Sequence, residues 1–183
     1  MNQQAVIDRT RRWISAMVIG LDLCPFARRV FEADTIHYVV TAAEDEKTLL
    51  EDLARELKGL AVCPIEFVET TLLIHPRALV NFLDYNDFLG DAERCVADLG
   101  LRGVLQIASF HPDYHFAITD AGAAENYTNR SPYPMLHLLR EESISAVAGD
   151  AHELLEIPRR NVATLRAVGI GKILDKLKAL EMG

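Results

Sequence analysis

The sequence predicts an α/β or α+β sandwich: a small, mainly parallel sheet of three to four strands covered by helices, with a helical C-terminal third. Over residues 36–110, apolar segments of strand length alternate with amphipathic helical segments, as in parallel strands joined by right-handed crossovers. Helical periodicity precedes this region and dominates after residue 134. Because half of the 183 residues are apolar, the chain can build one substantial core, and residues 1–183 are predicted to form a single domain.

The predicted helices are marked by periodicity and by their ends. Apolar side chains at helical spacing predict a first helix over residues 4–19, which ends at Gly20. A capping box of Thr41 and Glu44 precedes a second helix, which ends at Gly59. Further helices are predicted over residues 77–89, 92–99, 135–145, 151–156, 158–167 and 172–181.

The predicted strands are short apolar runs that end at polar residues or at proline. They cover residues 36–40, 65–74 and 104–110, with residues 114–118 as a short fourth strand. Residues 119–134 are rich in Gly, Ala, Asn, Ser and Pro, which predicts a long loop. Because loops of this length in a compact domain often carry function, this loop is a candidate binding segment.

Composition and charge narrow the classes of partner. The chain has a net charge of −8, and residues 31–100 hold fifteen acidic and five basic side chains, which disfavours nucleic acid as the main partner. The longest apolar run, residues 16–21, is far below the roughly 18 residues needed to cross a bilayer. The N-terminus lacks a signal-peptide pattern, and the three widely spaced cysteines fit a reducing compartment. We therefore expect a cytoplasmic protein without a membrane partner.

Two His-Pro dipeptides are the most informative feature of the sequence. His75 and His111 each follow a predicted strand, and His115 lies close behind the second. If those strands are parallel, both imidazoles emerge at the same rim of the sheet, where open α/β sheets place ligands. Histidine suits acid–base chemistry there because its ordinary pKa is close to neutral. The alternative is that each histidine is only a polar residue at a strand end.

Cys24 is the candidate nucleophile. It precedes Pro25 and a predicted helical turn, and a thiol at a helix N-terminus has a lowered pKa. The alternative is a buried structural cysteine. Cys63 and Cys95 are interpreted as packing residues. Zinc or iron held by Cys24, His75, His111 and His115 is chemically reasonable, although these residues do not have the spacing of a known metal motif.

The segment Asn129-Arg130-Ser131 is the candidate substrate-binding element, because it is predicted to lead directly into a helix. Ser131 could cap that helix, whose first amides would bind an anion. Arg130 could hold a carboxylate or phosphate, and Arg140 would share a helix face with His137. The alternative is a proline-rich turn with an ordinary cap.

Three motifs in the chain resemble an uncharacterised family of bacteria and plants, a domain of unknown function with the number fourteen-fifteen. The motifs are Leu-Cys-Pro-Phe-Ala around Cys24, Ser-Phe-His-Pro at residues 109–112, and Asn-Arg-Ser-Pro-Tyr-Pro at residues 129–134. The resemblance covers nearly the whole chain and implies a single domain. It implies no catalytic residues, because the family has no assigned activity.

The leading hypothesis is an intracellular enzyme that acts on a small anionic substrate through a Cys/His cluster at the sheet rim, with the reaction class unassigned. Cys24 would be the nucleophile or redox thiol, His111 the general acid or base, and His75 an orienting residue, while Arg130 would bind the negative group. One alternative is a metal-binding protein or metalloenzyme that uses Cys24, His75, His111 and His115. The other is a non-catalytic binding module in which residues 119–134 grip a ligand.

Overall fold

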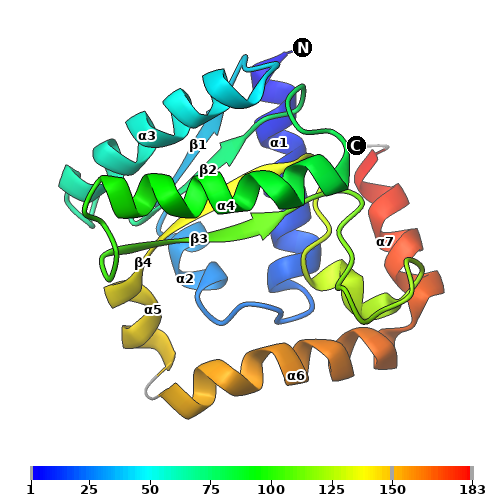
Figure 1. The fold of residues 1–183 in the computed structure, drawn as a ribbon. Helices are drawn as coiled ribbons and strands as arrows, with labels where there is room; N and C mark the ends of the chain where they lie inside the picture. The colour runs from blue at the N-terminus through cyan, green and yellow to red at the C-terminus, as the bar shows by residue number, and fades with distance from the viewer. Residues whose placement is uncertain (1, 149–150, 182–183) are drawn as a thin grey trace.

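A computed structural model describes residues 2–148 and 151–181 of the chain. Its four strands are β1 (Ile36–Val40), β2 (Thr70–Ile74), β3 (Leu105–Phe110) and β4 (Met135–Arg140). Its α-helices are α1 (Gln3–Trp13), α2 (Ala27–Glu32), α3 (Glu46–Val62), α4 (Phe82–Asp98), α5 (Glu141–Ala148), α6 (Ala151–Val168) and α7 (Ile170–Glu181). A π-helix, η1 (Ile14–Ile19), continues α1, and a 3₁₀ helix, η2 (Ala124–Thr128), interrupts the long loop. The mixed α/β fold class and its helical C-terminal third are confirmed (Figure 1).

The sheet has the order β1-β2-β4-β3, and most of its pairing is antiparallel. Only β1 and β2 pair in parallel, whereas β4 runs opposite to both of its neighbours, β2 and β3. The prediction of a mainly parallel sheet was therefore wrong. Strands β1, β2 and β3 nevertheless share one direction, so the C-terminal ends of β2 and β3 do meet at one rim.

The cause of this error is β4, which the sequence predicts as the start of a helix. Its residues, Met-Leu-His-Leu-Leu-Arg, include good helix formers and no β-branched side chain. In the fold this segment lies between β2 and β3, and every residue except His137 is buried. A central strand that is covered on both faces is almost continuously apolar, so its sequence lacks the usual alternation.

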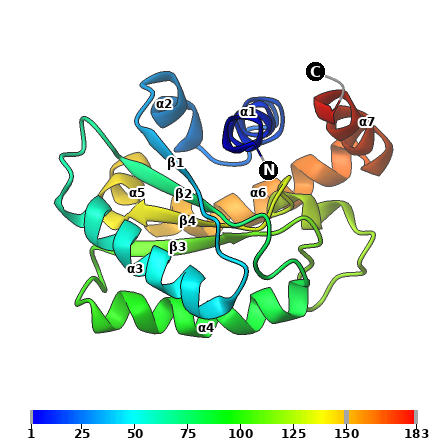
Figure 2. The same cartoon turned by 90° about the horizontal axis from the view of Figure 1, so that it is seen from above.

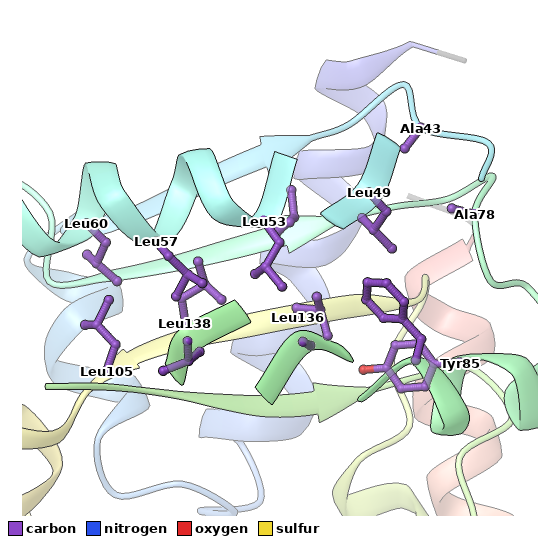
Figure 3. Close-up of a cluster of buried hydrophobic side chains, with 14 residues drawn as sticks. Ala43, Leu49, Leu53, Leu57, Leu60, Ala78, Tyr85, Leu105, Leu136 and Leu138 are labelled. Carbon is purple, nitrogen blue, oxygen red and sulfur yellow. The ribbon is translucent and has the colours of Figure 1, made fainter. Parts of the chain in front are cut away.

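The sheet separates two apolar clusters. On one face, α3 packs on the sheet through leucines such as Leu53 and Leu57, and α4 packs through residues such as Phe88, with Tyr85 at the end of the cluster (Figure 3). On the other face lie α1, α2 and α7 (Figure 2), where Trp13 and Met17 pack against strand residues such as Leu72. The alternation of a strand sends Leu72 to one face and its neighbour Leu73 to the other.

The N-terminal helix covers the expected residues but changes its hydrogen bonding after Trp13. The side chain of Asn2 caps α1, and the π-helix η1 extends it to Ile19. The helix ends before Gly20, as predicted, and this position requires glycine because a Cβ would collide with the carbonyl oxygen of Ala16. A π-helical segment re-aims its side chains relative to an α-helix and often accompanies functional sites.

Several predicted element boundaries were wrong. Residues 82–98 form one helix rather than two, beginning at its cap Asn81, and residues 65–69 and 114–118 are not strands. In the C-terminal third, Pro158 lies inside α6 instead of starting a helix, and Gly169, with a φ of 81°, separates α6 from α7. None of the described helices is both long enough and apolar enough to span a membrane.

Helices α6 and α7 are held against the rest of the fold by a few specific contacts. The amide of Asn161 donates to the carbonyl oxygen of Leu23 at 2.7 Å, and Arg166 pairs with Glu125 of η2 at 2.6 Å. Leu165 and Ile173 are fully buried in the cluster on the α1 side. These contacts bring α7 to the same end of the sheet as the predicted rim.

Candidate functional site

The structure brings His75, His111 and His115 together at the predicted rim, around aromatic side chains of α4. Tyr85 lies between the first two, with ring centroids 5.7 Å from His75 and 5.2 Å from His111. The ring of His115 is 4.8 Å from that of Phe82. Tyr85 also joins two strands at this rim, because its hydroxyl donates to Met135 O at 2.9 Å and accepts from the Phe110 amide at 3.0 Å.

Two of the rim histidines, His75 and His111, are internal structural residues. His111 Nδ1 accepts a hydrogen bond from the Asp113 amide at 3.0 Å, so its proton is on Nε2, 3.2 Å from Leu79 O. His75 donates from Nδ1 to Ala78 O at 3.0 Å. Burial lowers the pKa of both imidazoles, that of His75 to about 4. These neutral rings hold the loops that follow β2 and β3, and His111 has no ring nitrogen left for acid–base work.

The histidine cluster does not form a metal site with its neighbours. Among the described residues, no three His, Cys, Asp or Glu side chains are grouped so that they could hold a metal ion. The physical reason is clear at His111, where both ring nitrogens already have hydrogen-bond partners. The set proposed from the sequence, Cys24, His75, His111 and His115, is also divided between the two faces of the sheet.

Cys24 lies on the other face, in a small apolar cavity of about 50 Å³ beneath η1 and α2. The histidine that lines this cavity with it is His137, together with aromatic residues such as Trp13 and Phe110. Helix α2 does follow Cys24, and the amides of Phe26 and Ala27 favour a thiolate, but desolvation is larger and raises the pKa of the thiol. The expected activation by the helix is therefore outweighed by burial.

His137 is also held in its neutral form. The Thr70 hydroxyl is 2.6 Å from Leu138 O, so it must donate to that carbonyl and accept from His137 Nε2 at 2.7 Å. Burial lowers the pKa of His137 to about 4. Cys24 and His137 thus share a cavity as two neutral groups, which is unlike an activated thiolate–imidazolium pair.

A second and larger cavity opens at the rim, and the motifs Ser-Phe-His-Pro and Asn-Arg-Ser-Pro-Tyr-Pro meet there. We call it the rim cleft; its volume is about 320 Å³. The amide of His111 donates to Asn129 O at 3.1 Å, and Asn129 Nδ2 donates to Ser109 O at 2.9 Å, so the two motifs are bonded to each other. The described residues that line the cleft are Arg9, Pro112, Asp113, Tyr127, Arg130, Ser131, Pro132, Leu177 and Leu180.

Arg130 is fixed at this cleft by the long loop. Its Nε donates to Tyr114 O at 2.9 Å and its Nη2 to Ala121 O at 2.6 Å. Its guanidinium lies 4.7 Å from the centroid of the Tyr127 ring, a cation–π contact. Among the residues that the structure describes, Arg130 has no carboxylate partner, although it is half-buried.

Ser131 and Arg140 occupy positions that differ from the sequence-based expectation. The segment after Ser131 is strand β4, so it offers no helix N-terminus, and the Ser131 hydroxyl donates to Tyr133 O at 2.6 Å. Arg140 ends β4 and is five residues from Met135, which places it roughly 17 Å from the rim. There its Nη2 donates to the carbonyl oxygens of Leu60, Cys63 and Val68.

Sequence reasoning missed Arg9, Asp113 and Tyr127 as residues of the cleft. Arg9 comes from α1, and its guanidinium lies 5.5 Å from the centroid of the Tyr133 ring. In the sequence, Arg9 stands out only because it lies outside the apolar stripe of the first helix. Any solvent-exposed arginine has such a position, so this signal does not indicate a cleft. Asp113 had a stronger signal, because it directly follows the second His-Pro dipeptide.

The fold and the cleft define an α/β protein with an arginine-lined pocket at the rim of its sheet. Residues 5–174 match the family described as "Protein of unknown function (DUF1415)", and the chain belongs to that family. No curated protein and no solved structure matched the chain.

Proposed function

We propose that this protein binds a small anionic ligand, carrying a carboxylate or phosphate group, in the rim cleft. The observation that carries the proposal is Arg130, a half-buried cation held by two carbonyl oxygens and without a carboxylate partner among the described residues. A partly desolvated charge of this kind is costly unless an opposite charge is near it. An anion in the cleft would supply that charge.

The setting of Arg130 suits anion recognition. Its stacking on Tyr127 and its two hydrogen bonds fix the guanidinium plane, so little rotamer entropy is lost when a ligand binds. Arg9 adds a second guanidinium to the same cleft, in a chain whose net charge is −8. The cleft volume of about 320 Å³ is at the small end of the range for ligand pockets.

The proposal is for binding and includes no catalytic step. The described lining of the cleft has no cysteine or histidine. Cys24 is on the other face of the sheet, and His111 uses both ring nitrogens in internal hydrogen bonds. An enzymatic role for Cys24 and His111 stays a sequence-based prediction, which this geometry does not favour.

Isothermal titration calorimetry with inorganic phosphate and with 4-methylpentanoate tests the proposal. Wild-type protein should bind at least one of these anions with saturation, and Arg130→Gln should weaken that binding by about tenfold or more, since a charge-assisted pair is lost. Arg130→Lys keeps the charge but not the planar fork, so its affinity should lie between the two.

Arg102→Gln is the matched control, because Arg102 is exposed at a turn before β3 and is not part of the cleft lining. Circular dichroism and the melting temperature of each variant establish that it is folded. Saturable binding that is equally strong in Arg130→Gln, or no saturable binding of either anion to wild-type protein, would refute the proposed function.

A further inference from the structure

The rim cleft contains an acidic group as well as the arginines. Asp113, in the loop after β3, lines the same cavity as Arg9 and Arg130. Its position is fixed through its backbone, because its amide donates to His111 Nδ1 at 3.0 Å. Among the described residues, its carboxylate takes part in no ion pair and accepts no hydrogen bond. The carboxylate is therefore available to a ligand.

A ligand with negative charge alone would be attracted by Arg130 and repelled by Asp113, because both residues line the same small cleft. Asp113 is exposed, so solvent screens part of this repulsion, but the like charges still disfavour a simple anion in this cleft. A ligand that also carries a positive group turns the repulsion into an attraction. The charge pattern of the cleft is thus complementary to a zwitterion.

The remaining wall of the cleft is apolar. Leu177 and Leu180 of α7 line it, together with Pro112 and Pro132. Both leucines are half-buried. The cavity volume of about 320 Å³ is at the small end of the range for ligand pockets, which favours a small ligand. The ligand that fits therefore has two opposite charges and a short apolar part.

Building on the proposed function, we infer that the rim cleft takes a free α-amino acid with a small apolar side chain. Its carboxylate would contact the guanidinium of Arg130, with Arg9 close by, and its ammonium group would contact Asp113. Its side chain would lie against Leu177 and Leu180. Asp113 is then the residue that selects amino acids over simple carboxylic acids.

Three ligands with the same branched carbon chain test this inference by calorimetry: leucine, 4-methylpentanoate, which lacks the amine, and isopentylamine, which lacks the carboxylate. Wild-type protein should bind leucine about tenfold more tightly than 4-methylpentanoate and should bind isopentylamine weakest. Asp113→Asn should remove the advantage of leucine and leave the affinity for 4-methylpentanoate unchanged or higher. The asparagine keeps the backbone hydrogen bond to His111.

Asp87→Asn is the matched control, since Asp87 is an exposed residue of α4 outside the cleft lining. If 4-methylpentanoate binds through Arg130 as tightly as leucine, or if Asp113→Asn weakens both ligands equally, the amino-acid inference is wrong and the proposed anion site stands. If neither phosphate nor 4-methylpentanoate binds with saturation, the proposed function fails, and the amino-acid inference, which rests on it, fails as well.

Discussion

At the residue scale, the histidines show how burial decides the chemistry of a side chain. His75 and His111 have the positions that the two His-Pro dipeptides predict, at the ends of β2 and β3. The bond from His75 to Ala78 O is local, but the rest of their surroundings could not be predicted, because Tyr85 and, for His111, Leu79 O come from segments that only the fold brings close. The sequence thus located the rim correctly, whereas the ionisation state of its histidines depends on tertiary packing.

Two histidines with low pKa values, the buried His75 and the partly buried His137, predict an acid-sensitive fold. The pKa of His75 and of His137 is about 4 in the native protein, against about 6.5 in an unfolded chain, because burial disfavours the charged ring. Between these values the unfolded state binds protons that the native state does not. The free energy of unfolding should therefore be at its full value above pH 6.5 and fall as the pH drops toward 4, by about 1.4 kcal/mol per pH unit for each histidine.

Urea denaturation at several pH values between 7.5 and 4.5 measures this effect. His75→Gln should flatten the curve by the contribution of one histidine, and Gln can keep a donor near Ala78 O. His37→Gln is the control, because His37 is exposed on β1. A wild-type unfolding free energy that stays constant over this range, or that rises toward pH 4.5, would contradict the neutral state of these rings.

Cys24 also shows that the ionisation state of a side chain depends on tertiary packing and not on local sequence alone. Its local sequence correctly indicated a thiol just before a helix, α2. The rest of its environment is the apolar cavity formed with η1 and the sheet, which raises the pKa of the thiol instead of lowering it. Its predicted partner, His111, is on the opposite face because successive strand residues alternate, with Phe110 directed to the Cys24 side.

At the element scale, β4 determines how much of the fold could be predicted. The positions and directions of β1, β2 and β3 follow from local pattern and chain order. The insertion of residues 135–140 between β2 and β3 does not, because their helical propensity is overridden by pairing with two strands. Because β4 pairs antiparallel with both neighbours, the sheet is mostly antiparallel and not mainly parallel as predicted. Strand β4 also removed the helix N-terminus expected after Ser131.

Arg140 forms hydrogen bonds between the end of β4 and neighbouring segments. We therefore expect its replacement to lower the free energy of unfolding. Arg140 is 6% exposed, and its Nη2 donates to carbonyl oxygens at the end of α3 and in the loop before β2. Arg140→Met should lower the free energy of unfolding by about 3 kcal/mol, because buried carbonyls lose a charged donor. Chemical denaturation measures the loss.

Arg102→Met serves as the control for Arg140, since Arg102 is exposed near the same end of the sheet. The control should change the unfolding free energy by less than about 0.5 kcal/mol. A comparable small effect of Arg140→Met would show that the three carbonyl contacts do not stabilise this end of the sheet. Anion binding at the distant rim cleft should be unchanged in folded Arg140→Met, because this arginine belongs to the other end of β4.

At the scale of the whole molecule, the rim cleft is assembled from parts that are far apart in the sequence. Helix α1, the loop after β3, the 3₁₀ helix η2, the loop before β4 and helix α7 each contribute residues to its lining. Helix α6 joins this assembly through the pair of Arg166 and Glu125. Sequence periodicity predicted the terminal helices, but not that they would pack beside the long loop and complete a cavity.

Titration of the ¹⁵N-labelled protein with 4-methylpentanoate, followed by NMR, tests the anion site most directly. The Arg130 Nε–H signal and the backbone amides of Asp113 and Ser131 should show the largest shifts and should saturate together, and these shifts should disappear in Arg130→Gln. Shifts that saturate with neither 4-methylpentanoate nor inorganic phosphate, or that centre on the cavity of Cys24 and His137, would contradict an anion site at the rim of the sheet.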